Sequence, residues 1–164
     1  MRVLHVLDHS IPLQSGYTFR SRAIINEQRA LGWETCHVTS PKHNPANAVP
    51  EKETVDGIEF YRCQPSSGMF ARLPVLGQLA IIDALSRRLL EVAQREKPDV
   101  MHAHSPALNG VAAIRAGRKL GIPVVYEVRG FWEDAAVSHG TSSEGGLRYR
   151  LTRAMETWAL RRAD

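Results

Sequence analysis

Short apolar runs of strand length alternate with longer segments of helical character, and this alternation limits the fold more than any other feature of the sequence. The four clearest runs are RVLHVL (2–7), WETCHVTS (33–40), DVMHAHS (99–105) and VVYEVRG (124–130). Strands that alternate with helices in one sheet are paired in parallel through right-handed crossovers. We therefore predict a doubly wound, mostly parallel α/β sheet.

The helical segments differ in the faces that they are expected to bury. The side chains expected to be buried are Ala23, Ile24, Ala30 and Leu31 in the segment ending at Gly32; Ile81, Ile82, Leu85, Leu89, Val92 and Ala93 in 77–97; and Leu147, Leu151, Met155 and Trp158 in 147–162. Small residues in 107–120 allow that helix to lie close against the sheet. Asp56-Gly57 lies between two alternating runs in 52–64 and predicts a hairpin.

Composition excludes several classes of protein. The 164 residues are 43% hydrophobic and 23% charged, which is ordinary for one globular domain. The two cysteines, Cys36 and Cys63, form no metal or disulfide motif, so we expect buried thiols in a reducing compartment. No apolar run reaches the length of a membrane span, and His5, Asp8 and His9 interrupt the apolar start. We expect a cytoplasmic chain, with peripheral contact at the inner face of the membrane as an option.

Polar residues gather where three predicted strands end, in 8–17, 103–107 and 129–134. The carboxyl ends of parallel strands lie at one edge of a sheet, which is where ligands bind in such folds. The polar and glycine residues expected there are Asp8, His9, Ser15, Gly16, His104, Ser105, Arg129, Trp132 and Glu133.

Three stretches carry a resemblance to a known family. RVLHVLDHSIPLQSGYTFRSRAIINEQRALGWETCHVTSPKH resembles the start of a family 4 glycosyltransferase of the GT-B fold, with GWETCHVTS similar to its G-x-E-V-x-V-x-T strand. KPDVMHAHSP is similar to its P-D-V-V-H-x-H strand. VVYEVRGFWED resembles the next strand in members that act on bacterial exopolysaccharide, including those linked to exosortase systems.

The resemblance implies a Rossmann-like domain on the acceptor side of a two-domain enzyme. Residues 1–164 would be the N-terminal half, and a C-terminal domain carrying a Glu-x7-Glu motif would bind the donor. The whole enzyme would transfer a sugar from a nucleotide-sugar to a glycan or lipid-linked acceptor in exopolysaccharide biosynthesis, without a metal. The 164 residues alone are expected to be inactive.

The resemblance also implies roles for particular residues. His104 is expected to be catalytic, because the second histidine of the family's H-x-H lies in the catalytic cleft. Ser15, Gly16 and Arg20 are expected at the donor diphosphate, with Gly16 alone where many members have two glycines. The residues expected to contact the acceptor are His9, Tyr17, Arg129, Trp132 and Glu133.

Simpler roles remain open for the same residues: a turn glycine at Gly16, a solvated charge at Arg20 and a cover for the sheet edge at Trp132.

A nicotinamide-binding domain is disfavoured because LQSGYTF lacks G-x-G-x-x-G. A zinc hydrolase using His102 and His104 is disfavoured because we expect these side chains on opposite faces of the sheet. A nucleic-acid binder is disfavoured because the basic residues are scattered. A stand-alone, non-enzymatic α/β ligand-binding module is the remaining alternative.

The last helix, 147–162, is expected to lie against the sheet beside a further strand. Without that strand the sheet edge would be open, and we expect the fragment to self-associate through this helix. Two alternatives are that the helix folds back on its own chain, or that its basic face contacts a membrane.

Overall fold

A computed structural model describes residues 1–44, 48–65, 74–130, 143 and 145–164. Six strands form one sheet in the order β3-β4-β2-β1-β5-β6, and every neighbouring pair is parallel except β3 with β4. Their bounds are β1 Arg2–Leu7, β2 Glu34–Thr39, β3 Lys52–Val55, β4 Ile58–Arg62, β5 Val100–His104 and β6 Val124–Glu127. The predicted fold class is confirmed.

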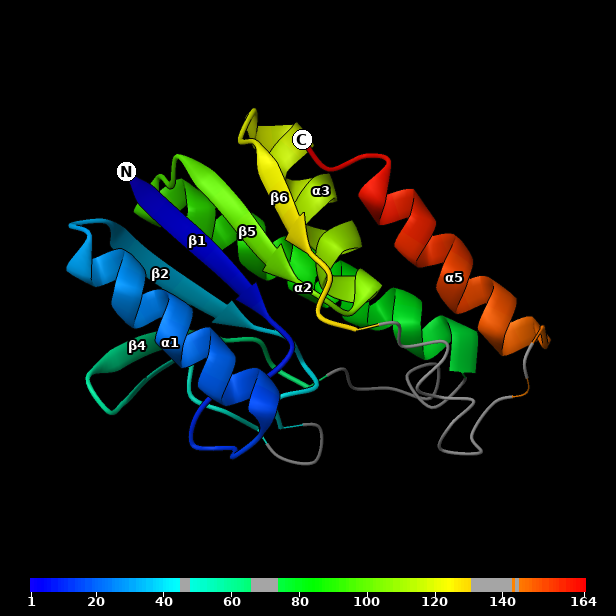
Figure 1. The fold of residues 1–164 in the computed structure, drawn as a ribbon, viewed down its shortest axis with the longest axis horizontal. Helices are drawn as coiled ribbons and strands as arrows, with labels where there is room; N and C mark the ends of the chain where they lie inside the picture. Colours follow the sequence, from blue (N-terminus) through cyan, green and yellow to red (C-terminus); the bar gives the residue numbers. More distant parts are fainter. Residues whose placement is uncertain (45–47, 66–73, 131–142, 144) are drawn as a thin grey trace.

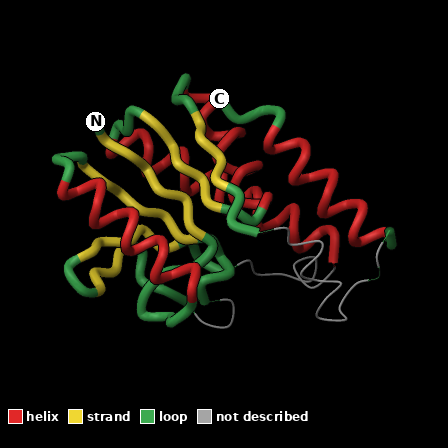
Figure 2. The backbone as a smooth tube through the Cα atoms, in the orientation of Figure 1, coloured by secondary structure: helices red, strands yellow, loops and turns green. Residues whose placement is uncertain are grey.

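Four helices among the described residues accompany the sheet: α1 Gly16–Ala30, α2 Pro74–Glu96, α3 Ala107–Leu120 and α5 Leu147–Leu160. Helix α1 lies over one face of the sheet, α2 and α3 lie behind the other, and α5 runs beside α3 (Figures 1 and 2). Within the part of the chain that is described, none of the helices has the length and hydropathy needed to cross a bilayer.

The main apolar core lies between the sheet and helices α2 and α3. Leu4 and Val6 of β1 and Met101 of β5 are buried there against Leu85 and Leu89 of α2. Strand side chains alternate between the two faces of a sheet, so the intervening residues of β1 and β5 face α1. The predicted stripe of α2 is confirmed, with Ile81 only partly buried and the other five residues fully so.

The face beneath α1 is mixed: Leu7 of β1 and Ile58 and Phe60 of β4 form a small apolar cluster with Ile25 of α1, and histidines lie beside it. His5 of β1 is paired in register with His37 of β2 on one side and with His102 of β5 on the other, so three histidines form a row across adjacent strands. His104 lies two residues beyond His102 on the same face, and the rings of His102 and His104 have centroids 4.0 Å apart. The sheet therefore has one apolar face, which forms the main core, and one mixed face, where imidazoles lie beside a smaller apolar cluster.

The predicted buried face of α1 is wrong. The helix buries Thr18, Ser21 and Ile25, whereas Leu31, expected to be buried, is 71% exposed. The face beneath the helix is mixed, so the side of α1 that it buries is mixed too: Ile25 packs on Leu7 and Phe60, while Gln28 hydrogen-bonds to His5. Hydrophobic periodicity identifies a buried helix face only where the opposing surface is apolar.

The expected orientation of the last helix is also wrong. Leu147 and Leu151 of α5 are 75% and 43% exposed, while Glu156 is buried. The Glu156 carboxylate accepts hydrogen bonds from the Ala107 amide at the start of α3 (3.0 Å) and from the Tyr126 hydroxyl (2.6 Å). Glu156 and Ala159 are thus the buried residues of α5, and of the predicted stripe only Met155 and Trp158 pack against the core, both partly buried.

The smaller predictions hold. Asp56 and Gly57 have positive φ angles and join β3 to β4, as a two-residue hairpin turn requires. Cys36 and Cys63 are buried free thiols. The small residues of α3 allow close packing: a Cβ on Gly117 would lie 2.5 Å from Val124 Cγ2 and 2.6 Å from the Ile122 carbonyl oxygen.

This contact predicts the effect of one methyl group. Gly117→Ala should lower the free energy of unfolding by about 1–3 kcal/mol, because the added Cβ collides with backbone that cannot move without disturbing the turn into β6. Urea denaturation measures it. Gly16→Ala is the matched control, because a Cβ there meets no atom within 4 Å. Equal stability of the two variants would contradict the close packing.

Candidate functional site

The polar loops predicted to share the carboxyl edge of the sheet are brought together by Arg129, just after β6. Its Nη1 donates to the Tyr17 carbonyl oxygen (3.1 Å) and to Ser21 Oγ (2.7 Å) on α1, and its guanidinium lies 4.6 Å from the centre of the Tyr17 ring. Its backbone N–H donates to Ser105 Oγ after β5 (3.0 Å). One side chain thus connects the ends of β5 and β6 to the start of α1.

Glu127, the last residue of β6, is the anion at the centre of this edge. Its Oε1 lies 2.7 Å from Nη2 of Arg20, and its Oε2 lies 3.3 Å from Nη2 of Arg129. Oε2 is also 2.7 Å from His104 Nδ1 and 3.2 Å from His102 Nε2. Burial alone would raise the pKa of Glu127, but its polar contacts with His104 and the charge of Arg129 hold it far below the ordinary value. The carboxyl is therefore ionised.

His104 is more deeply buried than the sequence suggested. The sequence places it at the carboxyl edge of the sheet, and there the side chain is fully buried, with Nδ1 toward Glu127 and Nε2 2.9 Å from His5 Nδ1. Burial lowers the pKa of His104 to about 3, against the opposing effect of Glu127, so the ring is neutral at pH 7. The catalytic role stays a prediction.

The expected separation of His102 and His104 is wrong as well. Residues two apart in a strand lie on the same face, and the rings are adjacent. His5, His102 and His104 each offer a ring nitrogen within 4.8 Å of the others, a spacing that a metal ion could use. However, the facing nitrogens of His5 and His104 are hydrogen-bonded to each other, and the guanidinium of Arg129 lies 2.6 Å from His104 Nδ1. A divalent cation beside that fixed positive charge is electrostatically disfavoured.

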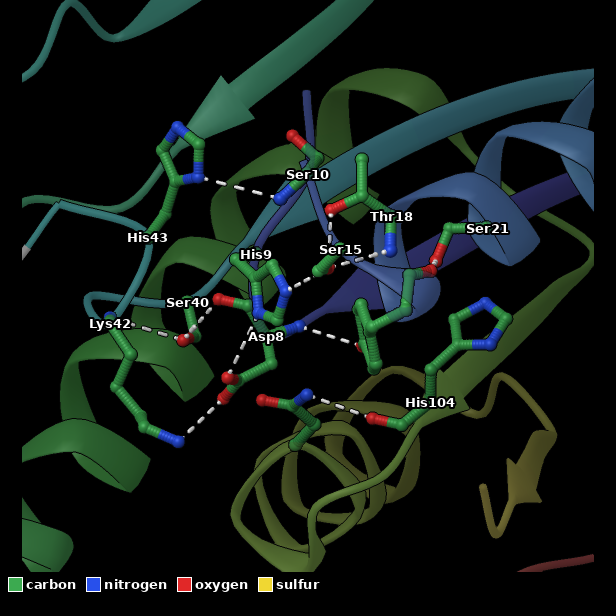
Figure 3. A network of polar contacts seen from close by, with 12 residues as sticks. Asp8, His9, Ser10, Ser15, Thr18, Ser21, Ser40, Lys42, His43 and His104 are labelled. Carbon is green, nitrogen blue, oxygen red and sulfur yellow. Dashed lines mark hydrogen bonds and ion pairs between the residues drawn. The ribbon is translucent and has the colours of Figure 1, made fainter. Parts of the chain in front are cut away.

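The loop after β1 forms a second polar group (Figure 3). Ser15 is the N-cap of α1: its Oγ accepts from the Thr18 amide (3.1 Å) and lies 2.8 Å from His9 Nε2. The Asp8 carboxylate pairs with Lys42 Nζ at 2.9 Å. Burial alone would raise the pKa of Asp8, but the hydrogen bond with His9 and the charge of Lys42 lower it. These contacts fix the loop that leads into α1.

Gly16 is the first residue of α1, and nothing inside the described structure requires it to be glycine. A Cβ at this position would meet no atom within 4 Å, and Gly16 is not among the positive-φ glycines. The first N–H groups of a helix have no carbonyl partner in a preceding turn and attract anions. An open glycine at a helix N-terminus suits the close approach of an anionic group.

Comparison with known proteins identifies the family. The glycosyl transferase 4-like domain family matches residues 15–164. A GDP-mannose-dependent alpha-mannosyltransferase of Mycolicibacterium smegmatis is 30% identical over 163 residues, which are 97% of this chain and 40% of that protein. The chain belongs to the glycosyl transferase 4-like family.

Other relatives agree with this assignment. Sulfoquinovosyl transferase SQD2 of Arabidopsis thaliana is 30% identical over 111 residues, which are 68% of this chain and 19% of that protein. The sucrose-phosphate synthase structure from Thermosynechococcus elongatus superposes with a TM-score of 0.70 over the whole chain and 41% of that protein, at 14% identity, and so shows the same fold. This glycosyl transferase 4-like domain spans about 40% of the length of the mycobacterial relative.

The predicted site residues of this glycosyl transferase 4-like domain fall into three groups. Ser15, Gly16 and Arg20 lie together in the first turns of α1, and Arg20 is bound to Glu127. His9 and Tyr17 lie beside them, with ring centroids 4.6 Å apart, and Arg129 contacts Tyr17. Trp132 and Glu133 lie outside the described residues.

Sequence reasoning missed Glu127, Lys42, Ser21 and the pair His5 and Gln28. One signal was available for Glu127: it interrupts an apolar run at the carboxyl end of a predicted strand. His5 also had a signal, since it occupies the middle of an apolar strand, where an ionisable side chain needs a buried partner. Ser21 and Gln28 carried no signal, because polar residues on a helix ordinarily face solvent.

The buried histidines predict a dependence of stability on pH. Burial lowers the pKa of His104 to about 3 and of His37 to about 4, and it also lowers the pKa of His5 and His102. The ordinary pKa of histidine is near 6.5. As the pH falls below this value, these histidines therefore take up protons in the unfolded chain but not in the folded chain. Each histidine that stays neutral lowers the free energy of unfolding by roughly 2 kcal/mol at pH 5 relative to pH 7.

Urea denaturation at several values between pH 7 and pH 5 measures this loss, in a range above the ordinary pKa values of the carboxyl groups. His37→Phe should make the decline shallower, because it removes one such group, whatever its effect at pH 7. A free energy of unfolding that stays constant between pH 7 and pH 5 would show that these rings are protonated in the fold.

Proposed function

We propose that this domain serves a glycosyltransferase that moves a sugar from a nucleotide-sugar to a glycan or lipid-linked acceptor. The observation that carries the proposal is the open N-terminus of α1 at Gly16, next to Arg20 and Arg129. Two of the curated relatives are described as GDP-mannose-dependent alpha-mannosyltransferases, which makes GDP-mannose the first donor to test.

The chemistry explains why these groups suit the reaction. The bond between the sugar carbon and the diphosphate oxygen breaks, and negative charge builds up on the departing diphosphate. Backbone N–H groups at the helix start can approach the phosphates at Gly16, where no Cβ intervenes, and the Arg20 side chain, 57% exposed, adds a positive charge one turn further on. The acceptor hydroxyl forms the new bond and loses its proton.

We assign this domain to the acceptor side, with His9, Tyr17 and Arg129 toward the acceptor. The mycobacterial relative is much longer than the matched region, so a further domain that holds the donor nucleotide belongs to the proposal. Exopolysaccharide synthesis remains our proposed setting, and transfer without a metal remains a prediction.

Substitution of Gly16 tests the diphosphate site. In the complete transferase, Gly16→Ala should lower kcat/KM for the nucleotide-sugar about tenfold, equivalent to about 1.4 kcal/mol, because a methyl group occupies the space that a phosphate oxygen needs. Thermal stability should not fall, since nothing in the described structure touches that Cβ and alanine favours the helix. Steady-state kinetics and a melting curve on the same preparation measure both quantities.

Gly121→Ala is the control for this test. Gly121 ends α3 with a φ of +70°, so alanine there is strained and should lower stability while leaving kcat/KM per folded molecule unchanged. Unchanged kinetics in Gly16→Ala would show that the diphosphate does not bind at the start of α1.

Calorimetry on the 164 residues tests whether a domain other than this one holds the donor nucleotide. With the donor-holding domain assigned to other parts of the enzyme, this domain should bind GDP-mannose and UDP-sugars weakly and transfer no sugar. Titration of each nucleotide-sugar into the purified domain gives the affinity directly. Micromolar binding by these residues alone would place the main donor site here and overturn the acceptor-side assignment.

A further inference from the structure

Helix α5 and the residues that follow it carry an excess of positive charge. Residues 147–164 contain five arginines and two acids. Among the described residues neither acid is paired with an arginine: Glu156 is buried against the start of α3, and the Asp164 carboxylate accepts a hydrogen bond from the Val124 amide. Helix α3, which packs beside α5, contains no acid and adds three exposed basic residues, Arg115, Arg118 and Lys119.

Several arginines on α1 and α2, by contrast, have acidic partners. Arg88 of α2 lies 2.8 Å from Glu91, and Arg22 of α1 lies 2.9 Å from Asp56. Three arginines of the α5 region have no acidic partner in the part of the chain that the structure describes: Arg150, Arg153 and Arg161. Like charges left together on one surface repel one another, so this group indicates an anionic binding partner.

Exposed apolar side chains lie among these arginines. Leu147 and Leu151 of α5 are exposed, and Arg150 lies within one turn of both on the same helix. Trp158 lines the same shallow hollow as the three arginines, and the guanidinium of Arg162 lies 4.8 Å from the centre of the Trp158 ring. We call Leu147, Arg150, Leu151, Arg153, Trp158 and Arg161 the α5 surface.

Three classes of partner could compensate this charge. A second copy of the chain that met the α5 surface with its own α5 surface would bring arginines against arginines, which disfavours the self-association expected from the sequence. Nucleic acid offers phosphates to the arginines but no apolar layer for the exposed leucines. An anionic bilayer offers both, because its headgroups carry phosphates and its acyl chains begin just below them.

We propose that the α5 surface binds the face of an anionic phospholipid membrane, so that the domain lies peripherally on the bilayer. The arginines contact the lipid phosphates, and the leucines and the indole of Trp158 reach the boundary with the acyl chains. The proposal goes beyond the proposed function and does not depend on it.

The direction of α5 relates this surface to the polar edge of the sheet. Glu156 bonds to Ala107, which follows the end of β5, while Asp164 bonds to Val124 at the start of β6. The helix thus runs back along the sheet from the carboxyl edge, and its first turns lie at the end of the domain where the polar site is (Figure 1). This placement favours the lipid-linked acceptor over a free glycan, a step that rests on the proposed function.

Sedimentation with lipid vesicles tests the contact. We expect the 164-residue protein to sediment with vesicles of equal parts phosphatidylglycerol and phosphatidylcholine, but not with vesicles of phosphatidylcholine alone. Raising the salt from about 0.1 M to about 1 M should release most of the bound protein, because the Debye length falls from about 10 Å to about 3 Å.

Charge-matched substitutions locate the contact. Arg150→Gln combined with Arg153→Gln should weaken partition into the anionic vesicles about 25-fold, because each arginine near such a surface contributes about fivefold. Arg87→Gln combined with Arg95→Gln is the matched control: it removes the same net charge from side chains of α2 that are 77% and 68% exposed, and it should leave the partition nearly unchanged. Glutamine keeps the helix propensity of arginine, and circular dichroism checks that both variants are folded.

The outcomes separate this proposal from its alternatives and from the proposed function. No sedimentation with the anionic vesicles, or an equal loss in the two variant pairs, would overturn the membrane contact. A dimer in light scattering that Leu151→Glu dissolves, or tighter binding to a double-stranded DNA oligonucleotide than to the vesicles, would also overturn it. Vesicle binding as expected in a complete protein that transfers no sugar would overturn the proposed function alone.

Discussion

The ionised carboxylate of Glu127 is the interaction on which the arrangement of the site depends. It lies at the end of β6, is only 17% exposed, and is surrounded by Arg20, Arg129, His102 and His104. A buried charge is costly unless it is paired and hydrogen-bonded, so each of these partners is held in place by the need to satisfy it. Since Arg129 also binds α1 through Ser21, one anion connects the ends of two strands with the helix above them.

The two faces of the sheet contribute differently to the domain. The face toward α2 and α3 is apolar and close-packed, and it supplies the hydrophobic stabilisation. The face toward α1 carries a smaller apolar cluster and a row of neutral histidines, whose hydrogen bonds fix orientation more than they add stability. Such a division lets the start of α1 and the ends of β5 and β6 form a defined polar edge on a rigid support.

The strands and helices and their mostly parallel arrangement could be predicted because the apolar runs, Gly32, Gly121, Pro98 and the Asp56-Gly57 turn each carry a local physical signal. The buried faces of α1 and α5 could not, because both helices turn polar side chains inward toward partners that are remote in sequence: Gln28 toward His5, and Glu156 toward Ala107 and Tyr126. For the same reason the environment of His104 could not be predicted from the chain alone. Its burial depends on α1 and on His5, 99 residues away.

A double-mutant cycle between Ser21 and Glu127 tests most directly whether this edge behaves as one unit, because Arg129 joins the two. The free energy of unfolding is measured by urea denaturation for Ser21→Ala, for Glu127→Gln and for the double variant, with Ser86→Ala on α2 in place of Ser21→Ala as the matched control. The account predicts a coupling of about 0.5 kcal/mol or more between Ser21 and Glu127, and none between Ser86 and Glu127. Additive effects of Ser21→Ala and Glu127→Gln, within about 0.3 kcal/mol, would contradict it.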